Sequence, residues 1–469
     1  MHLLAIGGSD GGISAALRAR ELDDAVEVTV MLDDEFPNFS ICGIPYLVSG
    51  EVADWRQLAH RRREAIEALG ISLLTSTTAR SIDVAAHRVR ATDAHGVERV
   101  IAYDRLVIAT GATPVRPPID GLDGLGAADG VHLVHTMGDA FEVLATLEQR
   151  RPERAVIVGA GYIGLEMAEA LTRRGLAVSL VEALPQVLAT LDPELADPVT
   201  TSLVGHGVDV RTATTVTEVA RDGDGLVVRA RARLDDGAAT PVEIRAGIVL
   251  VVTGVTPDTE LARAAGATTG ARGAIRVDQG MATGLPDVFA AGDCVVTHHV
   301  LLGETYLPLG TTAHKQGRVA GENALGGDRR FAGSLGTQVV RVFDAVAART
   351  GVRDREAREA GFDPRTVGAS GDDHKAYYPG ATTVDVRLTG DDASGRLLGV
   401  QLVGSVASAV HKRVDTAATA VLAGLTVDRV SDLDLAYTPP LGSPWDVLQV
   451  AAQRWLADGR ARPARDVAG

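Results

Sequence analysis

The chain has 469 residues, of which 46% are hydrophobic, and its formal net charge is −15 at pH 7. The length suffices for two or three domains, and the acidic balance argues against nucleic acid as a partner. No apolar run approaches the roughly 20 residues that a membrane-spanning helix needs, so we expect no membrane association. With two cysteines and no targeting segment at the start of the sequence, we expect a cytoplasmic protein.

The first predicted elements are an apolar strand at residues 3–6, a glycine turn and an alanine-rich helix over about 13–22. A glycine turn between a buried strand and a helix N-terminus forms a pyrophosphate site, because backbone N–H groups approach the phosphates and the helix dipole favours their charge. Gly7, Ser9 and Gly12 are therefore candidate cofactor contacts, although Ser9 stands where glycine is usual. The next strand, over residues 28–32, leads to Asp33, the candidate ribose ligand.

Cys42 follows this unit and has no second cysteine near it, since the other one is Cys294. A thiol that works alone cannot close an internal disulfide with a neighbour. Its oxidised form must then be a mixed disulfide, a persulfide or a sulfenic acid. The alternative is a buried cysteine with a packing role only, which is the role we expect for Cys294. A helix predicted over residues 54–69 comes next and carries His60 and three consecutive arginines.

A second unit of the same design begins with a strand at residues 155–158. Gly159, Gly161 and Gly164 form its turn, and its helix is predicted to reach about residue 174. The following strand ends at Glu182, where a carboxylate would accept hydrogen bonds from both ribose hydroxyls. No arginine follows to bind a 2′-phosphate, which favours NADH over NADPH. Two such units indicate two dinucleotide sites.

Three further segments are a strand that ends in Thr110 and Gly111, a similar strand and turn at Gly254, and an apolar strand that leads to Asp293. Together with the two glycine units, they resemble the FAD/NAD(P)-dependent pyridine nucleotide-disulfide oxidoreductases. The resemblance implies FAD and NADH as cofactors, with these four residues in the cofactor sites. It also implies that Asp293 binds the ribityl chain of FAD.

The resemblance implies an α/β fold with two Rossmann-like dinucleotide-binding domains, as in glutathione reductase, and a C-terminal α+β dimerisation domain. We expect an FAD-binding domain in two segments, an NAD(P)-binding domain between them, and a homodimer. The expected boundaries are residues 1–115 and 249–328 for the FAD-binding domain, 116–248 for the NAD(P)-binding domain and 329–458 for the dimerisation domain.

Cys42 and the tyrosine-bearing segments 376–381 and 434–440 resemble the single-cysteine branch of this family. Dithiol members carry a second cysteine five residues after the first, where this chain has Leu47. The branch holds coenzyme A disulfide reductases, NADH-dependent persulfide and polysulfide reductases, NADH oxidases and NADH peroxidases. The resemblance implies that Tyr377 and Tyr437 reach the partner subunit's Cys42 site as proton donors or substrate ligands. The alternative is that both are interface aromatics.

We therefore expect electrons to pass from NADH through FAD to a small-molecule disulfide, persulfide or polysulfide at Cys42. One competing activity is that of an NADH oxidase or peroxidase, which is less favoured because such enzymes often carry a histidine at the position of Asp10. An electron-transfer reductase of a ferredoxin-type partner and a non-catalytic redox-sensing protein are two further hypotheses that the sequence leaves open.

Arg18 and Arg20 of the first helix are the candidate substrate ligands, because related enzymes bind coenzyme A phosphates with basic residues there. Glu21 among them should weaken a phosphate site, and Ile41 replaces a polar neighbour of the thiol. We expect no metal site, because His298 and His299 lack a third ligand at metal-binding spacing.

Overall fold

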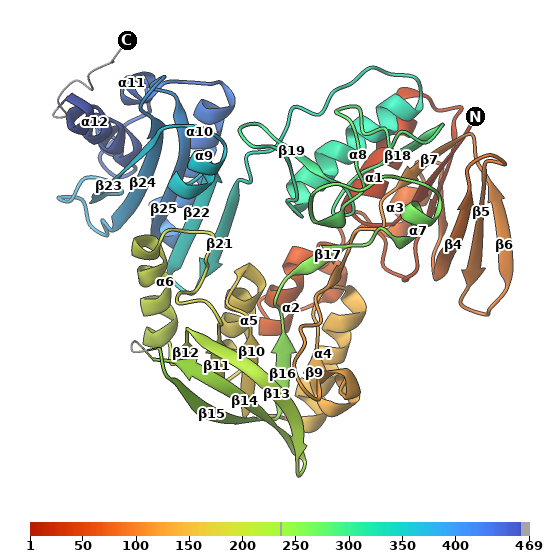
Figure 1. The fold of residues 1–469 in the computed structure, drawn as a ribbon, viewed down its shortest axis with the longest axis horizontal. Coiled ribbons are helices and arrows are strands. Elements are labelled where there is room, and N and C mark those ends of the chain that lie inside the picture. Colours follow the sequence, from red (N-terminus) through yellow and green to blue (C-terminus); the bar gives the residue numbers. More distant parts are fainter. Residues whose placement is uncertain (235–236, 461–469) are drawn as a thin grey trace. The chain divides into compact units, whose positions relative to one another are not determined.

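The computed structural model describes residues 1–234 and 237–460, and the chain divides into two compact units (Figure 1). Unit 1 comprises residues 1–152, 247–299 and 303–334, and unit 2 comprises residues 153–246, 300–302 and those from 335 onward. Within the described ranges, no helix combines the length and the apolar character that crossing a membrane requires.

A five-stranded parallel sheet forms the centre of unit 1, with the strand order β18-β7-β1-β2-β3. Both of its faces are covered, so alternate residues of one strand enter different cores: Leu3 and Ala5 pack on one side, Leu4 and Ile6 on the other. The strands are β1 (His2–Ile6), β2 (Glu27–Met31), β3 (Ile71–Leu74), β7 (Arg105–Ile108) and β18 (Val288–Ala290).

Two helices, α1 (Asp10–Leu22) and α8 (Gly310–Ala324), pack against each other on one face of this sheet. They approach closely because α8 presents glycines to α1. A Cβ atom on Gly317 would lie 2.2 Å from the carbonyl oxygen of Gly11, and one on Gly321 would lie 2.3 Å from that of Ala15. Helix α1 begins three residues earlier than predicted, because this packing outweighs the low helix propensity of glycine in its first turn.

The other face of the sheet packs against residues of an antiparallel ribbon of β4 (Thr77–Asp83), β5 (Arg88–Asp93) and β6 (Glu98–Ala102). Three small strand pairs and four short or medium helices complete unit 1. The pairs are β8 (Ala112–Pro114) with β17 (Val255–Pro257), β9 (Val131–His132) with β16 (Ile248–Val251), and β19 (Thr297–His299) with β20 (Gly303–Thr305); the helices are α2 (Ile44–Ser49), α3 (Arg63–Glu67), α4 (Met137–Arg150) and α7 (Glu260–Ala264).

The predicted helix over residues 54–69 is wrong. It is broken into a 3-10 turn, η2 (Trp55–Leu58), and the separate helix α3. Between them the backbone pairs with the segment before Cys42: the Ser40 N–H donates to the Leu58 carbonyl at 2.8 Å, and the His60 N–H donates to the Asn38 carbonyl at 2.9 Å. These long-range hydrogen bonds outweigh the local helix propensity on which the prediction rests.

Unit 2 begins with a second set of parallel strands, in which β11 lies between β10 and β12. A three-stranded antiparallel sheet, β13-β14-β15, follows in sequence. The elements are β10 (Arg154–Val158), α5 (Tyr162–Arg173), β11 (Ala177–Val181), α6 (Pro193–Gly205), β12 (Asp209–Arg211), β13 (Thr214–Asp222), β14 (Gly225–Arg233) and β15 (Ala239–Ala246).

The C-terminal part of unit 2 is a five-stranded antiparallel sheet in the order β21-β22-β25-β24-β23, with helices packed on it. Trp455 of α12 lies against the backbone of β24, where a Cβ atom on Gly390 would lie 2.8 Å from the indole ring. The elements are β21 (Gln338–Val342), β22 (Ala345–Gly351), α9 (Asp354–Glu359), β23 (Pro364–Asp372), β24 (Thr383–Asp391), β25 (Leu397–Ser405), α10 (Val410–Leu422), α11 (Val427–Ser431) and α12 (Val447–Arg460).

These elements confirm the predicted fold class, with two strand–glycine turn–helix units on parallel strands and a C-terminal antiparallel sheet covered by helices. The predicted boundaries of the individual domains stay predictions.

The contact between α1 and α8 generates a stability prediction. Gly317→Ala should destabilise the protein by about 1–3 kcal/mol, because the added methyl group has no room against the Gly11 carbonyl. Gly138→Ala in α4 is the matched control: its Cβ meets only Thr136 Oγ1 at 3.5 Å, and it should be neutral or stabilising by roughly 0.5–1 kcal/mol. Chemical denaturation measures both, and equal effects would contradict the packing argument.

Candidate functional site

The first glycine turn allows no side chain at two of the predicted cofactor positions. Gly7 has a φ of +117°, and a Cβ atom on it would lie 2.0 Å from the carbonyl oxygen of Ala109. A Cβ atom on Gly12 would lie 2.0 Å from the carbonyl oxygen of Gly7. Ser9, the exposed residue that precedes α1, has a φ of −95°, which any residue adopts. The turn thus keeps the geometry of a phosphate site although Ser9 replaces the usual glycine.

Three further predicted cofactor contacts, Asp33, Thr110 and Gly111, follow the carboxyl ends of strands in the same sheet. Asp33 is exposed two residues after β2, the place where a ribose ligand is expected. Thr110 and Gly111 follow β7, and the Thr110 hydroxyl donates to the carbonyl of Asp258 at 2.6 Å. Gly111 and Gly254 both have positive φ angles, +74° and +117°, so each turn depends on glycine.

Asp293 follows β18 at the same edge of the sheet. Burial and the nearby Asp10 carboxylate raise the pKa of Asp293 to about 6, against the opposing effect of a hydrogen bond from the Leu309 N–H. A carboxylate in this environment is stabilised by further hydrogen-bond donors, and the hydroxyl groups of a polyol chain would supply them. The residue therefore fits the ribityl chain of FAD.

Cys42 lies in a 3-10 turn, η1 (Ile41–Gly43), directly before α2, and it is exposed. Its loop is fixed to the first glycine turn, because the Asn38 N–H donates to the carbonyl of Gly8 at 2.8 Å. Aromatic packing also supports the loop, with ring centroids separated by 5.3–5.8 Å within the group of Phe36, Phe39, Trp55 and Phe141. The thiol is therefore held close in structure to the dinucleotide turn, and it is open to solvent.

Cys294 has the opposite environment. It is fully buried, and its Sγ lies 3.5 Å from the Ala291 carbonyl oxygen and 3.6 Å from that of Ile108. Burial raises the pKa of this thiol to about 11. Since the thiolate is the nucleophile, Cys294 is unsuited to redox chemistry at neutral pH, and Cys42 remains the candidate.

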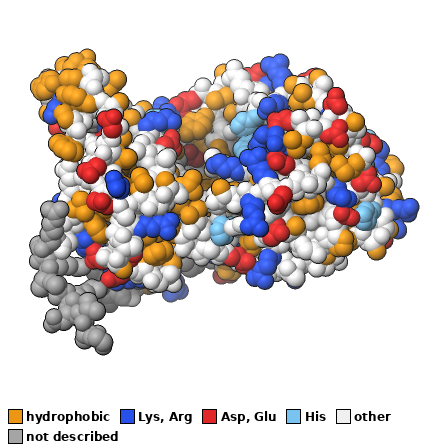
Figure 2. Space-filling view, turned by 90° about the horizontal axis from the view of Figure 1, so that it is seen from above, with side chains coloured by type: hydrophobic (Ala, Val, Ile, Leu, Met, Phe, Trp, Pro, Cys, Tyr) orange, Lys and Arg blue, Asp and Glu red, His pale blue; other side chains and the backbone are white. Residues whose placement is uncertain are grey.

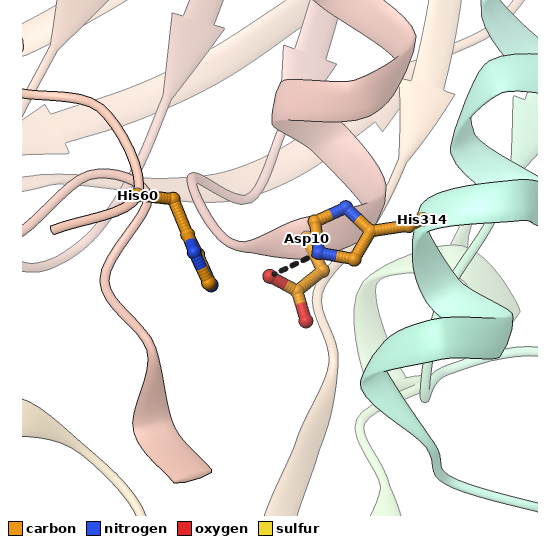
Figure 3. Close-up of side chains that lie close together, drawn as sticks. All are labelled: Asp10, His60 and His314. Carbon is orange, nitrogen blue, oxygen red and sulfur yellow. Dashed lines mark ion pairs between the residues drawn. The ribbon is translucent and has the colours of Figure 1, made fainter. Parts of the chain in front are cut away.

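A polar cluster that sequence reasoning missed lies beside the glycine turn (Figure 3). It consists of Asp10 at the start of α1, His60 after η2, and His314 in α8. The Nε2 atom of His314 lies 3.3 Å from Oδ1 of Asp10, and its Nδ1 lies 2.8 Å from the hydroxyl of Ser14. Burial raises the pKa of Asp10, while the two histidines act in the opposite direction. No spacing motif joins three residues so far apart in the sequence.

A cavity of about 260 Å³ opens beside this cluster. Its walls are both apolar and charged, and they belong to α1, α8 and the segments around Asn38 and His60. The lining residues are Ile13, Ser14, Leu17, Glu21, Asn38, His60, Arg61, His314 and Arg318. A cavity of this size, lined by α1, α8 and Asn38 of the loop that precedes Cys42, is suited to a small substrate.

The two arginines predicted to bind substrate are not among the lining residues. Arg18 contacts Glu322 at 2.7 Å and Glu21 at 3.1 Å. Arg20 donates to backbone carbonyls, at 2.8 Å in the case of Leu69. The arginines that line the cavity are instead Arg61 and Arg318, and Arg318 is paired with Glu21 at 3.1 Å.

The second glycine turn, in unit 2, precedes α5. Gly159 has a φ of +106°, Gly161 is the residue before the helix, and Gly164 is buried within it. The carboxylate of Glu182 accepts hydrogen bonds at 2.8 Å from the N–H groups of Ala160 and Leu184. Glu182 is thus fixed beside the turn, at the position where a ribose ligand is expected.

Tyr377 and Tyr437 lie together on the surface of unit 2, with exposed fractions of 73% and 44%. The first is in the β23–β24 loop and the second precedes α12; the segments meet where the Lys375 N–H donates to the Pro439 carbonyl. Partial desolvation and a hydrogen bond with Tyr437 raise the pKa of Tyr377. Leu441 and Trp445 nearby in sequence are also exposed. Figure 2 shows hydrophobic side chains, drawn in orange, gathered at the upper left of the view.

Comparison with known proteins gives two family matches. Residues 1–317 match the family described as pyridine nucleotide-disulphide oxidoreductase, and residues 337–447 match its dimerisation domain. The chain is 35% identical over 451 residues to the NAD(P)H sulfur oxidoreductase (CoA-dependent) of Pyrococcus abyssi, covering 96% of both chains. It is 32% identical over 457 residues to an NADH oxidase of Methanocaldococcus jannaschii, covering 97% of this chain and 98% of the other.

One solved structure that is similar to this chain is that of an NAD-dependent persulfide reductase from A. fulgidus. The two chains share 37% sequence identity and superpose with a TM-score of 0.91, over 98% of this chain and 83% of the other.

The contrast between the two thiols generates a prediction. Native protein treated briefly with iodoacetamide at pH 7.5 should be alkylated at Cys42, while Cys294, buried and with its pKa near 11, should react only after unfolding. Peptide mass spectrometry measures the extent of modification at each residue. Alkylation of Cys294 at a comparable rate in the folded protein would reverse the assignment.

Proposed function

Because the chain belongs to the pyridine nucleotide-disulphide oxidoreductase family, we propose that it uses NADH and FAD to reduce a disulfide, persulfide or polysulfide at Cys42. The observation that carries the proposal is the pairing of an exposed Cys42, tied through Asn38 to the first glycine turn, with a buried Cys294. With a single accessible thiol, the substrate must form a covalent bond to the sulfur of Cys42, and that bond must later break.

The two glycine turns and the carboxylates near them suit two different dinucleotides. The glycine turn and the N-terminus of α1 would hold the pyrophosphate of FAD, and Asp293 would accept hydrogen bonds from its polyol chain. Glu182, held by two backbone N–H groups, would accept the ribose hydroxyls of NADH and repel the 2′-phosphate of NADPH. FAD, when bound, supplies the exchange of two electrons between the nicotinamide and sulfur.

The chemistry at Cys42 is thiol–disulfide exchange. The Cys42 thiolate attacks one sulfur of the substrate, the substrate's S–S bond breaks, and the second sulfur leaves as a thiolate that takes up a proton. Two electrons from NADH and one further proton then break the bond between Cys42 and the retained sulfur. This step releases the second thiol, or sulfide from a persulfide, and restores the Cys42 thiolate.

The cavity supports a low-molecular-weight thiol as the substrate. Its walls offer Ile13 and Leu17 to an apolar group, and Arg61 and Arg318 to a negatively charged one. Because Glu21 already pairs with Arg318, a phosphate would have to displace a carboxylate. Coenzyme A is part of the name of the Pyrococcus abyssi relative. It is one member of the proposed substrate class, and its phosphates would have to compete with Glu21 for Arg318.

NADH oxidase activity is the second candidate. Asp10 stands where a histidine would assist oxygen chemistry, but His314 brings an imidazole to within 3.3 Å of the Asp10 carboxylate. The imidazole that α1 lacks would then be supplied by His314 of α8.

We further propose a cytoplasmic homodimer, in which Tyr377 and Tyr437 act on the substrate of the partner subunit. Only two cysteines in the chain are consistent with a reducing compartment. The match of residues 337–447 to the dimerisation domain and the exposed aromatic surface around Tyr437 support the assembly.

A substrate panel tests the function. NADH consumption should be faster with disulfides or persulfides, under anaerobic conditions, than with oxygen alone, and NADPH should be used less efficiently than NADH. Cys42→Ser should lose disulfide turnover while reduction of its flavin by NADH continues, and Cys294→Ser should retain turnover. Turnover of a protein acceptor by Cys42→Ser at the wild-type rate would indicate an electron-transfer reductase instead.

The role of Tyr437 is tested separately. Tyr437→Phe should lose about 100-fold or more in disulfide turnover, the usual contribution of general acid catalysis, while Tyr378→Phe, equally exposed at 44%, should be near wild type. Doubly tagged heterodimers of Tyr437→Phe with Cys42→Ser should recover activity, because one site then holds both intact residues. Heterodimers without recovered activity would contradict action across the interface.

A further inference from the structure

Asp10, His60 and His314 converge from three separate segments in unit 1 (Figure 3). One ligand atom from each, an imidazole nitrogen or a carboxylate oxygen, lies within 4.8 Å of the other two. We propose that this cluster is a binding site for a divalent cation of the Zn²⁺ class. The proposal goes beyond the redox function and does not depend on it.

The donor set is the first support. Two imidazoles and one carboxylate are a common set of protein ligands for Zn²⁺ in sites that keep a further position open. Zn²⁺ bonds of about 2.0–2.2 Å in tetrahedral geometry place ligand atoms roughly 3.3 Å apart. The pair of His314 Nε2 and Asp10 Oδ1 already has this separation, 3.3 Å. His60 is exposed, so its ring can move by the remaining distance at little cost.

Contacts behind the ligands fix their orientation. The Nδ1 atom of His314 lies 2.8 Å from the hydroxyl of Ser14, so the opposite nitrogen, Nε2, is presented to the cluster. A hydrogen bond of this kind to the second ring nitrogen is usual for histidines that bind metals. Asp10 is confined by α8, because a Cβ atom on Gly310 would lie 2.7 Å from its Oδ2. Two of the three ligands are thus held in place before any ion binds.

An unsatisfied polar group in the same cavity is a second, independent observation. Asn38 lines the cavity and is only 2% exposed, yet its Oδ1 has no hydrogen-bond partner among the described residues. A buried carbonyl oxygen without a donor is costly. A water molecule bound to a cation is a strong donor, and the cavity of about 260 Å³ has room for it.

The charge balance of the cavity permits a cation. Arg318 of α8 lines the cavity, and its charge is compensated by Glu21 at 3.1 Å. Arg61 is exposed, so solvent screens it. The carboxylate of Asp10 is the only anionic ligand of the three, which leaves a bound Zn²⁺ with net positive charge toward the cavity. The open position would therefore hold a water molecule.

Calorimetric titration of the FAD-loaded, full-length protein with ZnCl₂, after treatment with a chelator, tests the proposal. Wild type and Cys42→Ser should each bind one Zn²⁺ per chain with similar affinity, because the thiol is not among the ligands. Binding that disappears in Cys42→Ser would place the ion on the thiol and overturn the proposal. Absence of saturable binding to wild type would overturn it as well.

His60→Ala is the decisive variant, because an exposed loop side chain can be removed with little effect on folding. Its Zn²⁺ affinity should fall by at least the roughly 10–100-fold that loss of an outer-shell partner costs. His298→Ala removes an exposed histidine outside the cluster and should bind as wild type does. Flavin absorbance and the unfolding midpoint verify that both variants are folded. Unchanged affinity in His60→Ala would refute the site.

Anomalous diffraction from Zn²⁺-soaked crystals gives a readout that is independent of affinity. The expected peak lies at bonding distance, about 2.0–2.2 Å, from His314 Nε2 and the Asp10 carboxylate. A strong peak at other residues, with none at this cluster, would show that the measured binding belongs elsewhere.

Discussion

The close approach of backbone to backbone at the first glycine turn is the constraint on which unit 1 depends. A Cβ atom at Gly7, Gly12 or Gly317 would lie between 2.0 and 2.2 Å from a carbonyl oxygen. The turn is thereby pressed against the end of β7 on one side, and α1 is pressed against α8 on the other. Because no side chains fill the turn, its backbone N–H groups can reach a phosphate.

Several features of the site follow from that compact turn. Since α8 lies so close to α1, His314 reaches Asp10 at 3.3 Å and Ser14 at 2.8 Å. The Gly8 carbonyl accepts from the Asn38 N–H, and the Asn38 carbonyl accepts from the His60 N–H. One chain of backbone hydrogen bonds thus connects the turn to the loop of Cys42 and then to the segment of His60. Thiol, cavity and polar cluster are positioned by the same few contacts.

Prediction of local structure succeeds where the relevant residues are neighbours in the chain. The glycine turns, the carboxylate of Glu182 after its strand and the isolation of Cys42 are all local patterns, and their local geometry is what the structure shows. It fails where partners come from afar. The helix predicted over residues 54–69 is broken by pairing with residues 38–40. Arg18 and Arg20 contact Glu322 and backbone carbonyls that local sequence does not indicate, and their role in substrate binding stays a prediction.

The polar cluster shows the same limit in another form. In the sequence, Asp10 is the residue that replaces a histidine, and His60 belongs to the predicted helix over residues 54–69. Only packing of α8 on α1, together with the extended segment before α3, brings the three side chains of the cluster together. Nothing in the spacing of these residues encodes that proximity, because it is a property of the tertiary fold.

The exposed aromatic surface around Tyr437 has a consequence for how the protein behaves on dilution. Tyr377, Leu441 and Trp445 are each more than half exposed on a single chain, so isolated chains leave apolar area in contact with water. In the proposed dimer, association covers such area and completes each site with a tyrosine from the second chain. By mass action, the fraction of complete sites then falls as the protein becomes more dilute. Activity per chain would become a function of how much of the protein the cell makes.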